Sequence, residues 1–427
     1  MVSVSRPRIV RRSTDLEEED LPEQVSVALH ELVGAAKEGL LALSVGVGLA
    51  VVHELFEAEV TRLAGPKGKH DPERRAYRHG QEARQVTLGG RRVHVDKPRV
   101  RSLEEQEVEL RTFRAFAGRD LLTTAALERM LAGLSTRRYP AGLEPMGQVE
   151  PLATSKSAVS RRFIQGTEQK LAELFGRDLS QLDLLAIFID GILIAEHCVV
   201  VALGVDAQGR KQPLGLWEGS TENKTVCNAL LANLIERGLD PERPRLFVID
   251  GGKAIRAAVV STFGKHAVIQ RCRAHKRRNV LDHLPQSERT FVGRKLDQAW
   301  KEPNADRAEA QLRTLAKHLE VKHPGAAASL LEGLEETLTV TRLSLSPSLL
   351  RTFKSTNPVE SMISVGRTVA RNVKRWRDGK MVLRWTAAGL LEAEKQFRRV
   401  NGHREMPILR RALEQHYQRV ASTRKVA

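Results

Sequence analysis

The chain has 427 residues, of which 41% are apolar and 28% are charged, and its formal net charge is +17. This balance is typical of a globular protein with two or three domains, and it excludes a chain that is disordered throughout. Only 3 cysteines occur, which excludes a disulfide framework and indicates a reducing cytoplasm, while the positive charge favours phosphate-rich partners.

The first 110 residues divide into a polar start and a longer structured stretch. Residues 1–24 are charged and lack periodicity, which predicts disorder. Residues 25–110 are expected to form a helical region with a basic β-hairpin, whose glycine turn joins alternating strands within 86–95. The cations of this hairpin fit either phosphate contact or an ordinary solvated face. The apolar run 40–52 is too short to span a bilayer, so it indicates a buried helix or a dimer face, and no membrane contact is expected.

Residues 111–176 are predicted to form a helix-turn-helix-like DNA-binding region. A helical pattern covers 118–134, and a second helix is expected within 151–165, capped by Ser155 or Ser157. Ser160, Arg161 and Arg162 would point outward from this second helix, which a helix-turn-helix places in a major groove. A capped helix that binds nothing is the alternative.

Residues 177–285 alternate between apolar runs and helical patterns. Three strands followed by alternating helices and strands predict an α/β fold, in which helices pack on a mixed sheet. The strand candidates are 184–189, 197–204, 211–217, 245–249 and 266–271, and the helical patterns are 222–237 and 253–263.

The rest of the chain is predicted to be helical. Residues 286–345 show helical periodicity and no clear strand. Pro358 opens a helix that runs to about Arg377, and a further helix is expected from Lys380 to about Val400. Residues 361–427 hold 16 Lys/Arg against 5 Asp/Glu, but their interleaved apolar periodicity argues against a simple solubilising tail.

Three acidic residues stand at the ends of these elements. Asp190 and Asp250 each follow an apolar run, and Glu360 lies near the start of the helix opened by Pro358. Neighbouring strands would bring the two aspartates together, and Glu360 would complete a site for Mg²⁺ or Mn²⁺, which prefer carboxylate oxygens. Two such ions about 3.5–4 Å apart supply what phosphoryl transfer on nucleic acid requires.

Each acid also has a structural interpretation, which is favoured when that acid is considered alone. Asp190-Gly191 fits a two-residue hairpin turn. Asp250 fits the start of the next helix. Asn357-Pro358-Val359-Glu360 fits an N-cap, a proline at N1 and a capping glutamate at N3.

Four blocks of the sequence, which occur in one order, favour a catalytic role for the three acids over the structural interpretations. They are Phe188-Ile189-Asp190-Gly191, Phe247-Val248-Ile249-Asp250-Gly251, residues 272–279 and Ser355-Thr356-Asn357-Pro358-Val359-Glu360-Ser361. Together they resemble the signature blocks of Mutator-type transposases, the enzymes of a large family of bacterial insertion sequences. The resemblance covers roughly residues 75–420. It departs from the family pattern at Gly252, where serine is expected, and it is weaker over the first 70 residues.

The resemblance implies a ribonuclease-H-like mixed sheet core, interrupted by an all-helical insertion and preceded by a mainly helical DNA-binding region. Residues 177–285 would form the first part of this core, 286–350 the insertion, and 351–427 the catalytic-glutamate helix with basic C-terminal helices. The implied catalytic and metal-binding set is Asp190, Asp250 and Glu360, with spacings of 60 and 110 residues.

The implied function is that of an insertion-sequence DNA transposase, which cleaves and transfers DNA strands with Mg²⁺ or Mn²⁺. Its partners would be double-stranded DNA, both as terminal inverted repeats and as target, and further copies of the chain in a homodimer or larger assembly. The expected location is the bacterial cytoplasm, associated with the nucleoid. Two alternatives stay open: a nuclease of the same fold that does not join strands, and a non-catalytic DNA-binding regulator.

Cationic and aromatic residues are the predicted DNA contacts. Lys276, Arg277 and Arg278 follow Cys272 and His275, a pair that lacks the second pair needed for zinc and is therefore given a structural or DNA-adjacent role. Trp376 and Trp385 are candidates for stacking on an unpaired base, although burial of both in the core of the terminal helices is the favoured alternative. The C-terminal contacts are predicted to be Arg371, Lys374, Arg375, Trp376 and Arg384.

Overall fold

The computed structural model describes residues 48–133 and 156–426, apart from residues 70, 73, 89–90, 118, 220 and 222. The chain divides into two compact units, Met1–Ala126 with Thr136–Val159 and Leu127–Ser135 with Ser160–Ala427. Four predictions lie wholly or partly outside the described residues: disorder at 1–24, most of the apolar run 40–52, the hairpin turn at 89–90, and the turn and cap of the helix-turn-helix at 134–155.

In the first unit, a helix over residues 48–64 packs on an antiparallel three-stranded sheet. The predicted hairpin is confirmed, but its strands are longer than expected. The strands are β1 (Ala76–Leu88), β2 (Arg91–Ser102) and β3 (Glu107–Val108), and α2 (Arg111–Ala117) follows. The buried Glu59 accepts the backbone N–H groups of Arg111 and Thr112, each at 2.9 Å, and so connects the first helix to the start of α2.

The second unit is built on a mixed five-stranded sheet with the order β6-β5-β4-β7-β8. The strands β4, β5 and β6 are antiparallel, whereas β7 and β8 run parallel to β4. All five predicted strands are present. Their bounds are β4 (Leu184–Ile194), β5 (His197–Asp206), β6 (Lys211–Gly219), β7 (Arg245–Ile249) and β8 (Ala267–Arg271).

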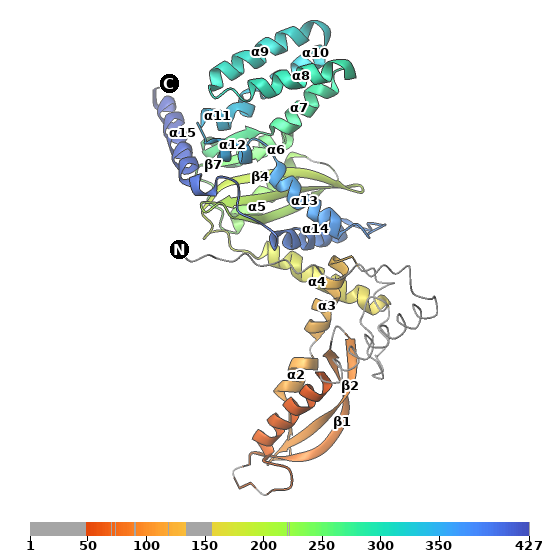
Figure 1. Ribbon diagram of the computed structural model, residues 1–427. Helices are drawn as coiled ribbons and strands as arrows, with labels where there is room; N and C mark the ends of the chain where they lie inside the picture. Colours follow the sequence, from red (N-terminus) through yellow and green to blue (C-terminus); the bar gives the residue numbers. More distant parts are fainter. Residues whose placement is uncertain are drawn as a thin grey trace, which may run out of the picture. The chain divides into compact units, whose positions relative to one another are not determined.

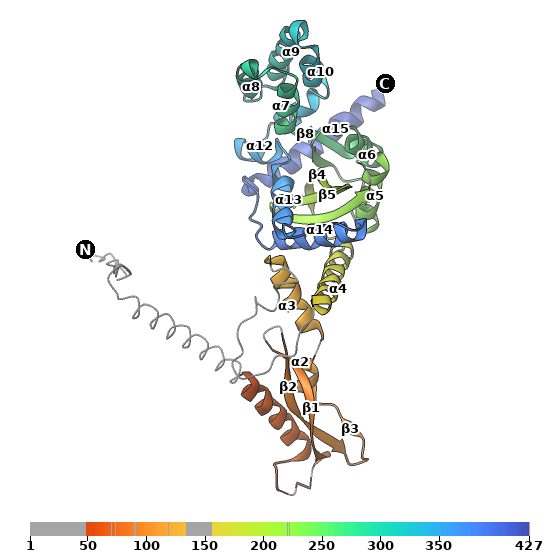
Figure 2. The same cartoon turned by 90° about the vertical axis from the view of Figure 1, so that its right-hand side faces the viewer.

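Helices cover both faces of this sheet, which makes a three-layer α/β arrangement (Figures 1 and 2). Because side chains alternate along a strand, Ile187 and Ile189 of β4 pack under one layer, and Phe188 packs under the other. The first layer holds α5 (Lys224–Glu236) and α6 (Lys253–Phe263). The second layer holds α13 (Asn357–Val369), α14 (Gly379–Glu394) and α15 (Met406–Val426).

Between β8 and α13 the chain forms only helices, as predicted for residues 286–345. Those up to residue 338 enclose their own apolar core, which includes Leu296, Leu312 and Leu338, whereas Leu349 and Phe353 pack into the core of the sheet. Figure 1 shows α7 to α10 as a separate group of helices beyond the sheet. The helices are α7 (Arg273–Asp282), α8 (Gln286–Ala299), α9 (Ala305–Lys322), α10 (Pro324–Leu331), η4 (Glu335–Leu338), α11 (Thr339–Arg342) and α12 (Pro347–Phe353).

The predicted helices after Pro358 are both too long. α13 ends at Val369, because the chain must reverse within residues 370–378 for the two helices to pack together, and α14 ends at Glu394. The two backbones meet so closely that a Cβ added to Gly389 would lie 2.7 Å from the Cα of Gly366. Within the described ranges, every helix is too short or too polar to cross a lipid bilayer.

Candidate active site

The sheet places Asp190 and Asp250 side by side. Ile189 of β4 pairs with Ile249 of the parallel strand β7, and each aspartate is the next residue of its chain segment. Phe188, Ile192 and Val248 face the layer that contains α13. The alternation of side chains therefore directs both aspartates to the same face as α13.

The structure shows that the hairpin-turn interpretation of Asp190-Gly191 is wrong. Both residues continue within β4, where Asp190 pairs with Val201 of β5, and the strand runs on to Ile194. The turn comes later, at Ala195, whose φ is 53°. Asp190 accepts the N–H of Gly191 at 3.0 Å, and Asp250 accepts the N–H of Gly252 at 2.8 Å.

The predicted cap at Asn357 is also wrong, by one position. Thr356 is the N-cap residue of α13, and the backbone N–H of Glu360 donates to Thr356 O at 3.0 Å. Glu360 is thus one residue too far into the helix to act as a capping glutamate at N3. Its side chain, which is 41% exposed, instead accepts the Thr356 hydroxyl at 2.6 Å.

The carboxylates of Asp190, Asp250 and Glu360 share one electrostatic environment. Asp190 is only 6% exposed, and this burial, together with the charge of Asp250, raises its pKa to about 7. The charge of Glu360 adds to this shift, and His275 opposes it. The hydrogen bond to Cys272 raises the pKa of His275, and the charges of Asp190 and Glu360 act in the same direction. The Nδ1 atom of His275 lies 3.7 Å from Glu360 Oε1.

This donor set fits a hard divalent cation. Three carboxylates offer only oxygen ligands, which Mg²⁺ and Mn²⁺ prefer, and their mutual repulsion would be relieved by a positive ion. A second group of ligand atoms comes from Cys272, His275 and Glu360, whose donors lie within 4.8 Å of one another. Glu360 belongs to both groups, so the two arrangements overlap at its carboxylate.

Two of the predicted DNA contacts lie inside the protein. Lys276 is 2% exposed, and its ammonium donates to the backbone oxygens of Ser329 at 2.6 Å and Glu332 at 2.7 Å. Arg384 is also buried and donates to Thr167 Oγ1 at 2.9 Å. Their cationic groups are occupied by protein oxygens, so these placements contradict the predicted contacts with DNA phosphate.

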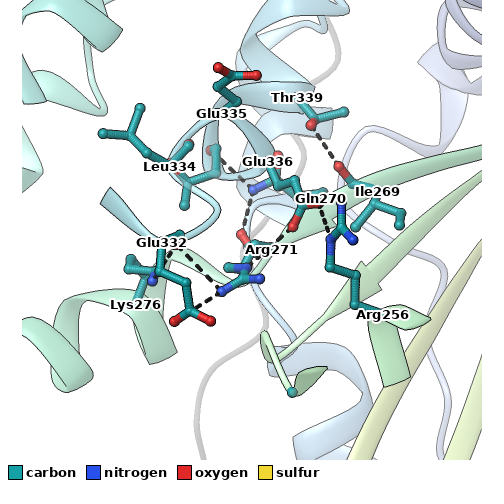
Figure 3. Close-up of polar contacts among 12 residues, drawn as sticks. Arg256, Ile269, Gln270, Arg271, Lys276, Glu332, Leu334, Glu335, Glu336 and Thr339 are labelled. Atoms are coloured by element: carbon teal, nitrogen blue, oxygen red, sulfur yellow. Dashed lines mark hydrogen bonds and ion pairs between the residues drawn. The ribbon is translucent and has the colours of Figure 1, made fainter. Parts of the chain in front are cut away.

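Lys276 belongs to a set of polar residues that we call the junction cluster, which connects the sheet to the helical segment (Figure 3). Arg271 at the end of β8 lies 3.3 Å from a carboxylate oxygen of Glu336 and 3.7 Å from one of Glu332. Gln270 bonds the backbone of Thr337 and Val340. The junction cluster is defined as Arg256, Gln270, Arg271, Lys276, Glu332 and Glu336.

The other predicted contacts are more accessible. Arg161, Arg278, Arg371, Lys374 and Arg375 are exposed, whereas Ser160, Arg162 and Arg277 are half-buried. Arg277 also pairs with Asp297 at 3.3 Å. The exposure of these side chains does not test whether they contact DNA, so those contacts stay predictions.

The two tryptophans differ in burial. Trp385 is buried with its ring 4.5 Å from that of Phe163, which confirms the core alternative for this residue. Trp376 is half-buried beside it, and their ring centroids are 6.4 Å apart. A cavity of about 240 Å³ lies against both indoles and is also lined by Arg367 and Arg371.

Sequence reasoning missed Thr356 and the junction cluster. Thr356 is in the Ser355-Thr356-Asn357-Pro358 block, and a threonine just before Asn-Pro is itself a helix-start signal. Gln270 and Arg271 end a predicted strand, but their partners lie more than 60 residues away in the chain. Local patterns do not identify partners at such separations.

Comparisons with known proteins show the family of this chain. A family model described as "Transposase, Mutator family" matches residues 25–400. The transposase for insertion sequence element ISRM5 of Rhizobium meliloti is 28% identical over 365 residues, which cover 84% of this chain and 90% of that protein. The transposase for insertion sequence element IS6120 of Mycolicibacterium smegmatis is 30% identical over 246 residues, which cover 56% of this chain and 73% of that protein.

Proposed function

Because this chain belongs to the Mutator family of transposases, we propose that it is an insertion-sequence DNA transposase whose catalytic residues are Asp190, Asp250 and Glu360. One observation carries the assignment of these residues. Two strand-end carboxylates and a helix carboxylate converge on one face of the sheet, and burial together with the charges of Asp250 and Glu360 raises the pKa of Asp190. A site for cations beside phosphate is the function that this arrangement supports best.

We further propose that the sheet and its helices form a ribonuclease-H-like core. The strand order, three antiparallel strands followed by two parallel ones, supports this assignment. The insertion would lie between β8 and the helix of Glu360, where α7 to α10 and η4 enclose their own core, while α11 and α12 pack into the core of the sheet.

Asp190, Asp250 and Glu360 would together hold two Mg²⁺ or Mn²⁺ ions. Such ions, when bound, activate an attacking oxygen and stabilise the leaving oxygen of a phosphodiester. The chain's own contribution is to hold the carboxylates in place. Backbone N–H groups of Gly191 and Gly252 fix the two aspartates, and the Thr356 hydroxyl fixes Glu360.

The proposed reaction has two steps that balance. In the first step, water adds to a phosphorus at the element end, the bond from phosphorus to the 3′-oxygen breaks, and a 3′-hydroxyl and a 5′-phosphate result. In the second step, this 3′-hydroxyl attacks a target phosphodiester and displaces the target's own 3′-oxygen, which takes up a proton as the attacking hydroxyl loses one. The number of phosphodiester bonds is conserved in the second step, so no nucleotide triphosphate is required.

We propose that double-stranded DNA lies along the exposed cations Arg371, Lys374 and Arg375, next to the cavity that Trp376 lines. The helix α4 (Lys156–Phe175), with Ser160, Arg161 and Arg162, would contribute to recognition of the terminal repeats. A homodimer or larger assembly would pair the two ends of the element in a bacterial cytoplasm.

A strand-transfer assay with pre-cleaved ends tests this proposal. The purified chain is mixed with a duplex that ends in a terminal repeat with a free 3′-hydroxyl, a target plasmid and Mg²⁺ or Mn²⁺. We expect joined products in the parent and none in Asp250→Asn. Cleavage of uncut repeats without joining would instead identify a nuclease, and binding without either reaction would identify a regulator.

A further inference from the structure

Thr356 lies at the centre of the contacts beside the three carboxylates. Its buried hydroxyl oxygen is 2.6 Å from Glu360 Oε1, 3.2 Å from His275 Nδ1 and 3.3 Å from Cys272 Sγ. A hydroxyl has one proton to donate, and the carboxylate is both the nearest and the charged acceptor. Thr356 therefore donates to Glu360, and the lone pairs of its oxygen accept from the Nδ1–H of His275.

The N-cap position of Thr356 makes this contact unusual. A threonine at an N-cap normally accepts a backbone N–H from the first turn of its own helix. The side chain of Thr356 makes no such bond in α13. Its hydroxyl is directed to Glu360 instead, so the residue that begins the helix orients the carboxylate that the helix carries.

Cys272 fixes the position of Thr356. Its buried sulfur accepts the backbone N–H of Thr356 at 3.3 Å and that of His275 at 3.4 Å. The backbone N–H of Cys272 donates to Ile249 O at 2.7 Å, and Ile249 directly precedes Asp250. One residue therefore connects the end of β7, the start of α7 and the start of α13.

A metal ion bound by Cys272, His275 and Glu360 is the competing interpretation of this group. Its donors lie within 4.8 Å of one another, and sulfur with imidazole suits a soft ion such as Zn²⁺. The Thr356 hydroxyl, however, lies within hydrogen-bond distance of all three residues. The hydroxyl already bonds Glu360 and His275, and the backbone N–H of Thr356 bonds the Cys272 sulfur, which favours a supporting role for these residues.

We infer that Thr356 and Cys272 are positioning residues, which hold the Glu360 carboxylate in register with Asp190 and Asp250. This inference rests on the proposed function, in which the three carboxylates bind divalent ions. Residues that support metal-binding side chains typically change metal affinity or activity by about 10- to 100-fold when they are substituted.

The test compares matched substitutions in the full-length chain. Thr356→Val removes the hydroxyl but keeps the shape and the backbone N–H, and Thr356→Ser restores the hydroxyl. Cys272→Ala removes only the sulfur anchor. The controls are Thr352→Val, at a buried threonine of α12 that bonds Asn401 O at 3.0 Å, and Cys227→Ala, at a buried cysteine of α5. Mn²⁺ affinity is measured from the EPR signal of unbound Mn²⁺, alongside strand cleavage and melting temperature.

We expect Thr356→Val to lower Mn²⁺ affinity and cleavage by about 10- to 100-fold, and Thr356→Ser to recover most of both. Cys272→Ala should lower both about tenfold, and it carries the test by itself if Thr356→Val does not fold. The two controls should lower the melting temperature without changing Mn²⁺ affinity.

The inference would be overturned if Thr356→Val bound Mn²⁺ as tightly as the parent does. If Thr356→Val does not fold, the same result for Cys272→Ala would overturn it. A parent that binds Mn²⁺ but does not cleave DNA would overturn the proposed function alone, and the affinity series would still decide the positioning roles. A parent that binds no Mn²⁺ would overturn both.

Discussion

Two polar clusters meet at the start of α7, and they differ in how their charges are balanced. His275 belongs to the carboxylate site, where it lies 3.7 Å from Glu360. The next residue, Lys276, belongs to the junction cluster, where its ammonium donates to two backbone oxygens. In the junction cluster, arginines meet glutamates: Arg271 contacts Glu332 and Glu336 (Figure 3). In the carboxylate site, like charges meet, and one histidine lies beside Glu360.

This difference separates a structural joint from a binding site. Where opposite charges meet and the cationic groups have oxygen partners, as around Arg271 and Lys276, the contacts hold two segments together and need no ligand. A group of carboxylates with excess negative charge is stabilised only by protons or by added cations. The junction cluster therefore explains how the helical segment is attached, and the carboxylate site has the charge expected of the proposed cation site.

The largest expected effect is the loss of cleavage in Asp250→Asn and Glu360→Gln. Each change removes one charge from the proposed metal-binding set, and we expect strand cleavage to fall by about 10³-fold or more. Glutamine at position 360 still accepts the Thr356 hydroxyl, so folding and DNA binding should be retained. Cleavage assays with Mg²⁺ and Mn²⁺, gel shifts and melting curves measure the three properties. Loss of folding in Glu360→Gln would show that the contact at the helix start depends on the charge.

The second prediction concerns pH. Burial and neighbouring charge raise the pKa of Asp190 to about 7, against about 3.9 in an unfolded chain. The folded, metal-free protein therefore keeps a proton that the unfolded chain releases, so its stability falls as pH rises from about 4 to about 7. The loss is on the order of 4 kcal/mol.

Melting temperatures measured with EDTA across this pH range check the prediction. Asp190→Asn should remove most of the pH dependence and should be more stable than the parent at pH 7.5. Mg²⁺ should stabilise the parent at pH 7.5 and stabilise Asp190→Asn much less. If the melting temperatures of the parent and the variant changed with pH in parallel, Asp190 would not be the group whose raised pKa causes the pH dependence.

The third prediction tests the junction cluster through neighbouring cations. Lys276→Met removes the ammonium that donates to the carbonyl oxygens of Ser329 and Glu332 and leaves the latter only the longer contact of 3.4 Å from Arg271. We expect a loss of about 2 kcal/mol of stability with unchanged DNA affinity. The exposed Arg278 is the matched control, and Arg278→Met should leave the free energy of unfolding nearly unchanged. Denaturant titrations and gel shifts measure both variants. If folded Lys276→Met bound DNA more weakly than the parent, the result would support the contact between Lys276 and DNA phosphate that the sequence predicted.

The smallest expected effect is at Trp376. Trp376→Ala should weaken binding to DNA ends with unpaired bases by about 1–2 kcal/mol, because stacking on an exposed base is lost, and should weaken duplex binding less. Fluorescence anisotropy with the two kinds of end measures this difference. Trp385→Ala is the control, since its ring packs on Phe163, and it should lower the melting temperature instead. Equal losses on both kinds of end would assign Trp376 to the core.

The sequence by itself determined the elements of the sheet and the identity of the acids. Alternating or continuous apolar runs predicted all five strands, because period-two burial is a local property of the chain. The blocks around Asp190, Asp250 and Glu360 predicted the family, which the comparisons confirm.

Only the tertiary structure decided what those residues contact. Lys276 and Arg278 look alike in sequence, yet one is buried against Ser329 and Glu332 and the other is exposed. Thr356 reads as an ordinary helix cap, but its hydroxyl meets Cys272, His275 and Glu360, two of them about 80 residues earlier in the chain. Local periodicity fixes which face of an element is apolar, but the partner of a polar side chain depends on packing between segments that are distant in sequence.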